Sequence, residues 1–149
     1  MKAILGFLLT VVVTGAFAVA SSAGNATSPR SGSFHATKEC SNYTGLAGSY
    51  CTITWSNLNA IGGGAKVIYA SAAGASSLSS DIVLDDGPGN RAVGHVTLDF
   101  ATATGVVTLS GGTGRFSGFH VNAIVTYNAH EDLWHWDGTY SFIPPGHDN

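Results

Sequence analysis

Three histidines and two aspartates occupy positions where β-strands would place them on polar faces. Side chains along a strand point alternately to its two faces, so residues two apart share a face. In three long runs of strand-forming residues, the polar positions hold His95, His120, His135, Asp99 and Asp137. An imidazole beside a carboxylate can act as a general acid or base, and three converging imidazoles can bind a metal ion. The alternative is a solvated polar face, or a subunit contact, in which these groups make ordinary hydrogen bonds.

The opposite faces of the same runs are apolar and rich in aromatic side chains. The aromatic positions are Phe100, Tyr127, Trp134, Trp136 and Tyr140. We predict that this face lines the interior of the fold and that these five residues bind a ligand. Aromatic rings with a polar tip suit a cavity for a small hydrophobic, partly oxygenated molecule. The alternative is that the five side chains only fill a packed core.

The chain has two cysteines, Cys40 and Cys51, and the segment between them includes Asn42, Gly45 and Gly48. These turn-forming residues allow the chain to fold back on itself, so the two cysteines are predicted to form a disulfide bond. A two-cysteine metal site is the alternative, but no neighbouring histidine or cysteine completes a tetrahedral set of ligands. We therefore predict a disulfide and no metal ion.

The N-terminal residues 1–23 have the pattern of a secretory signal peptide. A basic start at Lys2 precedes an apolar run over residues 3–13, and the small residues Ala18-Val19-Ala20 and Ser21-Ser22-Ala23 follow. Signal peptidase recognises this combination. A transmembrane anchor is the alternative, but polar residues and a glycine interrupt the run and no basic cluster follows it. We expect a secreted protein, extracellular or periplasmic, and this oxidising location favours the disulfide.

Length, composition and charge exclude several classes of protein. The 149 residues suffice for one domain, and 44% are hydrophobic while only 10% are charged. These values exclude a disordered chain and a coiled coil. The net charge is −3, and loss of Lys2 with the signal peptide makes it −4, so neither nucleic acid nor a membrane surface is an expected partner. Residues 24–32 are small and polar and are predicted to form a flexible leader, which leaves residues 33–149 as the folded domain.

The folded domain is predicted to be all-β. No helical apolar period is present after the signal peptide, and short runs of β-branched and aromatic residues alternate with glycine-rich turns. Predicted strands span residues 34–39, 50–56, 65–71, 81–84, 92–100, 105–110, 118–127 and 133–142. The serine- and alanine-rich residues 71–80 are predicted to form a loop. About eight strands joined by short turns favour a single antiparallel meander that closes into a barrel, over a sandwich.

Two segments together resemble one known family. Residues 107–118 read VTLSGGTGRFSG, and residues 85–95 read DDGPGNRAVGH. A GGTG turn followed by a basic residue and phenylalanine, downstream of a Gly-Pro turn that leads into a Val-Gly strand, resembles the plant dirigent proteins, allene oxide cyclases and related bacterial barrels. Gly111, Gly112 and Gly114 allow positive φ at a tight connection, and Phe116 can return the chain to the core. The chain resembles a secreted bacterial branch of this family.

The resemblance implies an eight-stranded antiparallel barrel, often a homotrimer, with a largely apolar cavity and no cofactor. Its enzymes steer the cyclisation or coupling of reactive hydrophobic intermediates. The positions of two basic residues of dirigent proteins correspond here to His95 and His120, which become the candidate catalytic residues, and Glu39 is the candidate for the dirigent acid. Both histidines stand where dirigent proteins have an always-charged group.

The expected function is therefore binding of a small hydrophobic ligand by a secreted barrel, with a cofactor-free cyclase or isomerase as its enzymatic form. A structural or interaction protein with a filled barrel is the alternative.

Overall fold

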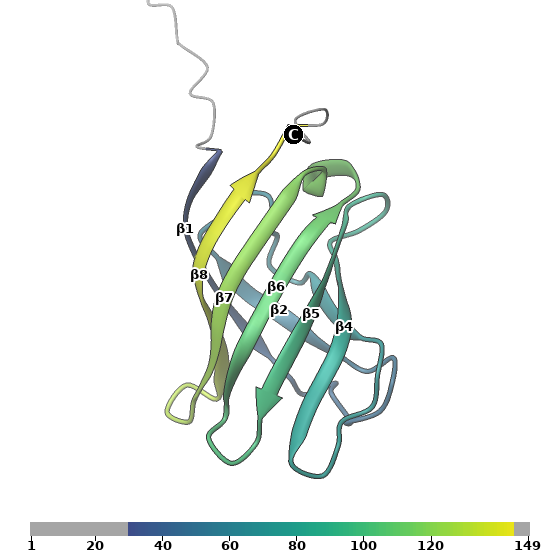
Figure 1. Cartoon of the computed structure of the whole chain (residues 1–149), viewed down its shortest axis with the longest axis vertical. Helices are drawn as coiled ribbons and strands as arrows, with labels where there is room; N and C mark the ends of the chain where they lie inside the picture. The colour runs from purple at the N-terminus through teal and green to yellow at the C-terminus, as the bar shows by residue number, and fades with distance from the viewer. Residues whose placement is uncertain (1–29, 145–149) are drawn as a thin grey trace, which may run out of the picture.

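Eight antiparallel strands close into one barrel in the computed structural model, which describes residues 30–144 (Figure 1). The strands are β1 (Ser31–Glu39), β2 (Tyr50–Ser56), β3 (Lys66–Tyr69), β4 (Ser77–Asp85), β5 (Arg91–Asp99), β6 (Thr104–Gly112), β7 (Phe119–Asn128) and β8 (Leu133–Phe142). Each strand pairs with the next, and β8 pairs with β1. The predicted all-β antiparallel barrel is thus confirmed. The expected signal peptide, residues 1–23, lies outside the described residues.

Strands β2 and β8 have the predicted bounds, whereas β1 and β4 begin earlier than expected. The prediction of a loop over residues 71–80 is wrong for its C-terminal part, because β4 begins at Ser77. Leu78 and Ser80 point inward and are buried, while their neighbours in β4 are exposed. The serine-rich composition conceals this alternation. Strand β1 begins at Ser31, within the predicted leader, and pairs there with β8.

Phenylalanine rings fill the end of the barrel where β1 begins and β8 ends, at the top of Figure 1. The ring centres of Phe116 and Phe119 lie 5.4 Å apart, and those of Phe119 and Phe142 lie 4.9 Å apart. Phe116 belongs to the 3-10 turn η1 (Gly114–Phe116) and is fully buried, so the GGTGRF segment does return the chain to the core. Of its glycines, Gly111 and Gly114 have positive φ.

The other end of the barrel carries the disulfide. Cys40 follows β1 and Cys51 lies in β2, and their sulfur atoms are bonded at 2.07 Å, as the sequence predicts. The bond closes the loop between the first two strands. Among residues 30–144, no helix is long and apolar enough to cross a membrane.

Removal of the disulfide is expected to lower the melting temperature without altering the barrel. Chain-entropy reasoning gives a loop of this length about 2.5–3 kcal/mol of stabilisation, which corresponds to about 10 °C for a domain of this size. The double variant Cys40→Ala/Cys51→Ala leaves no free thiol and places no hydroxyl in the core. Thermal unfolding followed by circular dichroism measures the shift, with reduced wild type as the matched control. A melting temperature equal to that of the oxidised wild type would contradict the expected role of the bond.

Candidate functional site

A lysine side chain lies inside the barrel near the end of β1. Phe34, Ala36 and Lys38 alternate along this strand, and all three are buried on its inner face. The pairing of β1 with β2 is irregular between Thr37 and Lys38, which is where a bulge can redirect a side chain. Lys38 is only 4% exposed. The strand pattern thus brings an ionisable amine into a largely apolar interior.

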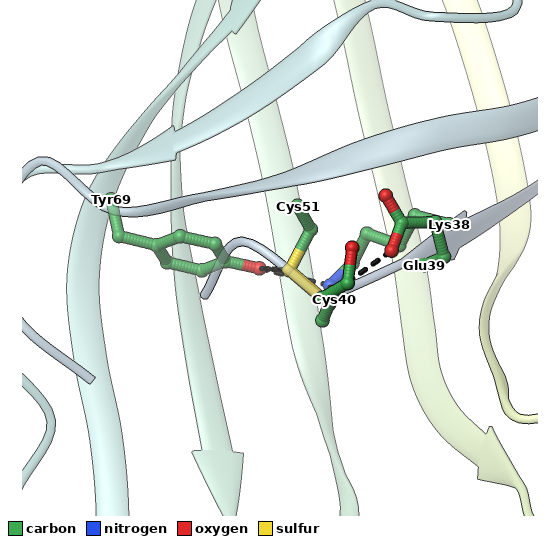
Figure 2. The surroundings of a disulfide bond; sticks show 6 residues. Lys38, Glu39, Cys40, Cys51 and Tyr69 are labelled. Atoms are coloured by element: carbon green, nitrogen blue, oxygen red, sulfur yellow. Dashed lines mark hydrogen bonds between the residues drawn. A yellow bond between two sulfur atoms is a disulfide. The ribbon is translucent and has the colours of Figure 1, made fainter. Parts of the chain in front are cut away.

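The Lys38 amine lies among the Tyr69 phenol, two tryptophan rings and a disulfide. Its Nζ donates a hydrogen bond to Tyr69 Oη over 2.9 Å and lies 3.5 Å from Cys40 Sγ (Figure 2). The distances from Nζ to the ring centres of Tyr69, Trp134 and Trp136 are 5.6, 5.5 and 5.8 Å. No carboxylate in residues 30–144 forms a salt bridge with this amine. Within residues 30–144, Lys38 therefore lacks the anionic partner that a buried ammonium usually needs.

Burial lowers the pKa of Lys38 from its usual 10.5 to about 7, because the interior cannot hydrate the charged form. The aromatic rings attract a cation but do not replace its lost hydration. Burial also raises the pKa of Tyr69 and that of Tyr43, so both phenols keep their protons. At neutral pH the site therefore offers a substantial fraction of uncharged amine beside a neutral hydroxyl group.

These groups line a cavity of about 100 Å³ at the disulfide end of the barrel. The lining residues are Lys38, Cys40, Tyr43, Cys51, Tyr69, Leu78, Val96, Leu98, Phe100, Val125, Trp134 and Trp136. Two further residues of this lining carry a buried polar atom. These atoms, Tyr43 Oη and Trp136 Nε1, have no hydrogen-bond partner among the described residues. A buried donor without a partner costs about 1–3 kcal/mol. An acceptor atom of a ligand would recover part of this free energy.

The disulfide positions one wall of the cavity. Tyr43 lies in the loop that Cys40 and Cys51 close, and its ring centre lies 4.9 Å from that of Tyr69 in β3. Cys51 Sγ lies 3.5 Å from Tyr69 Oη, so this sulfur atom touches the same hydroxyl that contacts Lys38 (Figure 2). The bond thus connects the loop to the polar centre of the cavity.

The structure brings together three of the five aromatic residues predicted to bind a ligand. Phe100, Trp134 and Trp136 line the cavity, and Trp136 is almost completely buried. Tyr127 packs on Trp134 with ring centres 5.0 Å apart, but its hydroxyl donates a hydrogen bond to Asp132 over 2.6 Å at the surface. Tyr140 lies toward the phenylalanine-filled end, 6.0 Å from Phe142 between ring centres.

The two histidines predicted to be catalytic lie on the outer wall. His95 Nδ1 is 2.8 Å from Asp81 Oδ1, and its Nε2 is 3.1 Å from Ser79 Oγ. His120 alternates with the buried Phe119 and Val121 and points outward. Neither histidine lines the cavity that contains Lys38. Their side chains are therefore separated from that cavity by the wall of the barrel.

The other histidines of the sheet each contact a different acidic group. His35 Nδ1 lies 2.7 Å from Asp137 Oδ1, and His135 Nε2 lies 2.6 Å from Glu131 Oε2. Asp81 stands directly opposite His95, and Asp137 directly opposite His35, so the strand register decides these pairs. The three predicted histidines do not converge. No cluster of three or more His, Cys, Asp or Glu side chains in the described part of the chain could hold a metal ion.

An open groove of about 660 Å³ crosses the outer wall over β6, β7, β8 and the start of β1. Serine, threonine and asparagine side chains form much of its lining, together with His120. The groove is larger than the inner cavity, but it is open to solvent. A small molecule there would keep most of its hydration, so we place the candidate site inside the barrel.

Lys38, Tyr69 and Tyr43 are the functional candidates that the sequence analysis missed. The signal for Lys38 was present, because the predicted strand 34–39 puts it on the same face as Phe34. Alternation also pairs Tyr69 with Val67 on one face of the predicted strand 65–71. Tyr43 lies in a loop and has no such periodicity.

The chain matches no known protein family, no curated protein and no solved structure. The function is therefore inferred from the fold and from the geometry of the cavity.

Proposed function

We propose that this protein binds a small hydrophobic molecule, bearing a hydrogen-bond-accepting oxygen, in the cavity around Lys38. The observation that carries this proposal is a nearly fully buried lysine without a carboxylate partner in the described residues, at the wall of an apolar cavity. Burying such a group costs stability, and a packed structural core has no need of it. A ligand oxygen near Lys38 Nζ would interact with the amine in a water-poor environment.

The walls and the polar atoms define the class of ligand. Leucine, valine and aromatic side chains make up most of the lining, which favours an apolar body. Lys38 Nζ, Tyr43 Oη and Trp136 Nε1 are hydrogen-bond donors on residues that line this cavity, which favours a carbonyl or carboxylate oxygen on the ligand. A dry cavity of about 150 Å³ in another protein holds benzene, so a space of about 100 Å³ suits a smaller molecule.

We further propose that this chain is related to the allene oxide cyclase and dirigent group. An eight-stranded antiparallel barrel with an apolar cavity is what the GGTGRF resemblance implies. If the protein is an enzyme, we propose that it is a cofactor-free cyclase or isomerase. Its chemistry would depend on Lys38 and Tyr69, which touch the cavity, rather than on the outward-facing His95 and His120. The disulfide is compatible with action outside the cytoplasm, extracellular or periplasmic.

Replacement of Lys38 by methionine is expected to weaken binding of oxygenated ligands selectively. A charged or strongly polar hydrogen bond in such a site contributes about 1.5–3 kcal/mol, so the affinity for a short ketone or carboxylic acid should fall at least tenfold. The affinity for an alkane of the same shape should change little. Titration by NMR or by the fluorescence of Trp134 and Trp136 measures both, in a Trp55→Phe background that removes an exposed tryptophan.

The matched control is Lys66→Met, which removes an exposed lysine in β3. It should leave both affinities unchanged. If no member of a panel of small ketones, acids and alkanes binds the wild type, the alternative of a filled structural barrel is favoured instead.

A further inference from the structure

We propose that Lys38 is a nucleophile that forms a reversible imine with small aldehydes entering the barrel cavity, an inference that rests on the ligand binding proposed above. A primary amine, a neutral hydroxyl 2.9 Å away and an apolar space of about 100 Å³ occur together at this one place. Imine formation needs an uncharged amine as nucleophile, and a nearby proton relay and a site that limits access of water both promote it.

The surroundings of Lys38 keep its amine available for attack. Only the uncharged amine has a lone pair that can add to a carbonyl carbon. Desolvation holds the pKa of Lys38 at about 7, whereas an exposed lysine titrates near 10.4. At pH 7 the neutral fraction is therefore about a thousand times larger at Lys38 than at an ordinary surface lysine.

The reaction balances without any oxidant or further reactant. Lys38 Nζ attacks the aldehyde carbon, a C–N bond forms, and the carbonyl π electrons move to oxygen. A proton passes from nitrogen to that oxygen, and the Tyr69 hydroxyl lies close enough to Nζ to relay it. The carbinolamine hydroxyl group then takes up a proton from solvent and leaves as water, while the nitrogen lone pair forms the C=N bond of a protonated imine. Addition of water reverses the sequence and releases the aldehyde.

The aromatic rings around Nζ favour the charged product of this step. A protonated imine keeps its positive charge at the position that Nζ occupies, within 5.5–5.8 Å of the ring centres of Tyr69, Trp134 and Trp136. The faces of such rings attract cations, and most strongly where water is excluded. The size of the cavity selects short aldehydes over long ones.

Reductive trapping tests this inference directly. Full-length mature protein is incubated at pH 7 with butanal and sodium cyanoborohydride, which reduces an imine to a stable secondary amine. Peptide mass mapping then measures butylation at Lys38 and at Lys66, the only two lysines within residues 30–144. We expect Lys38 to be labelled at least tenfold faster than Lys66. We also expect its rate to rise through about pH 7 rather than near pH 10.

Variants and an unreactive analogue separate the possible outcomes. Lys66→Arg should leave labelling of Lys38 intact, and Lys38→Met should abolish adduct formation in the barrel. Equal labelling of the two lysines would overturn the inference. If butanal and 1-butanol both bind by NMR but no Lys38 adduct forms, the imine is excluded and the proposed ligand binding stands. If neither molecule binds and no adduct forms, both proposals fail.

Discussion

Lys38→Met should make the folded protein more stable by about 3 kcal/mol at pH 7, and this gain should shrink as the pH rises. Burial lowers the pKa of Lys38 from 10.5 in the unfolded chain to about 7 in the folded protein. Between these values the unfolded state binds more protons at this site than the folded state, so wild-type stability increases with pH. The stability associated with the neutral amine is complete above pH 10.5 and is lost as the pH falls toward 7.

The size of the effect follows from the same two pKa values. A shift of this size corresponds to about 4 kcal/mol between pH 7 and pH 10.5. Methionine removes the free-energy cost of burying the Lys38 amine. It also removes the hydrogen bond to Tyr69, and the loss of that bond costs about 1 kcal/mol. Most of the gain should therefore disappear near pH 9.5, and the variant should become slightly less stable than wild type at higher pH.

Denaturant unfolding followed by far-UV circular dichroism at several pH values from 7 to 9.5 measures the difference between variant and wild type. Other titrating groups are common to both proteins and cancel in the difference. Lys66→Met is the matched control, because this lysine is exposed and should show no comparable pH dependence. A difference that stays constant over this pH range would mean that Lys38 does not change its proton affinity on folding.

The sequence predicted the barrel because each strand has its own local signal. Period-two alternation and glycine-rich turns recur along the chain, and each strand pairs with its sequence neighbour. The prediction of strands failed where apolar and polar residues do not clearly alternate. Ser77 and Ser79 were predicted to lie in a loop, but they lie in β4. The exposed serines there carry no hydrophobic contrast to mark the buried Leu78 between them.

The site was harder to predict, since it depends on how the ends of separate strands meet. Lys38, Tyr69 and Trp134 belong to β1, β3 and β8 and converge only when the barrel closes. The sequence could place Lys38 on an inner face of the barrel. It could not show which end of the barrel contains a cavity. The partners of the histidines show the same limit, because His95 of β5 contacts Asp81 of the neighbouring strand β4 and not Asp99 of its own strand.

Gly138→Ala is expected to destabilise the barrel by about 3 kcal/mol or more, because this glycine lets β7 and β8 approach closely. Gly138 stands opposite Ala123 of β7 and Phe34 of β1. A methyl group here would lie 2.0 Å from the Asn122 carbonyl oxygen, which belongs to backbone and cannot rotate away. Relief therefore requires the two strands to separate and to weaken their hydrogen bonds.

The matched control for this substitution is Gly63→Ala, in an exposed turn. The nearest atom to a methyl group there is the Thr54 carbonyl oxygen at 3.6 Å, an ordinary contact distance. Chemical denaturation of both variants should show a small change for Gly63→Ala and a loss several times larger for Gly138→Ala. Because Gly138 lies between Trp136 and Tyr140 in β8, separation of the strands would also displace the tryptophan that lines the cavity. Similar stability of the two variants would show that β7 and β8 can move apart without loss, and that close approach at Gly138 does not hold the barrel closed.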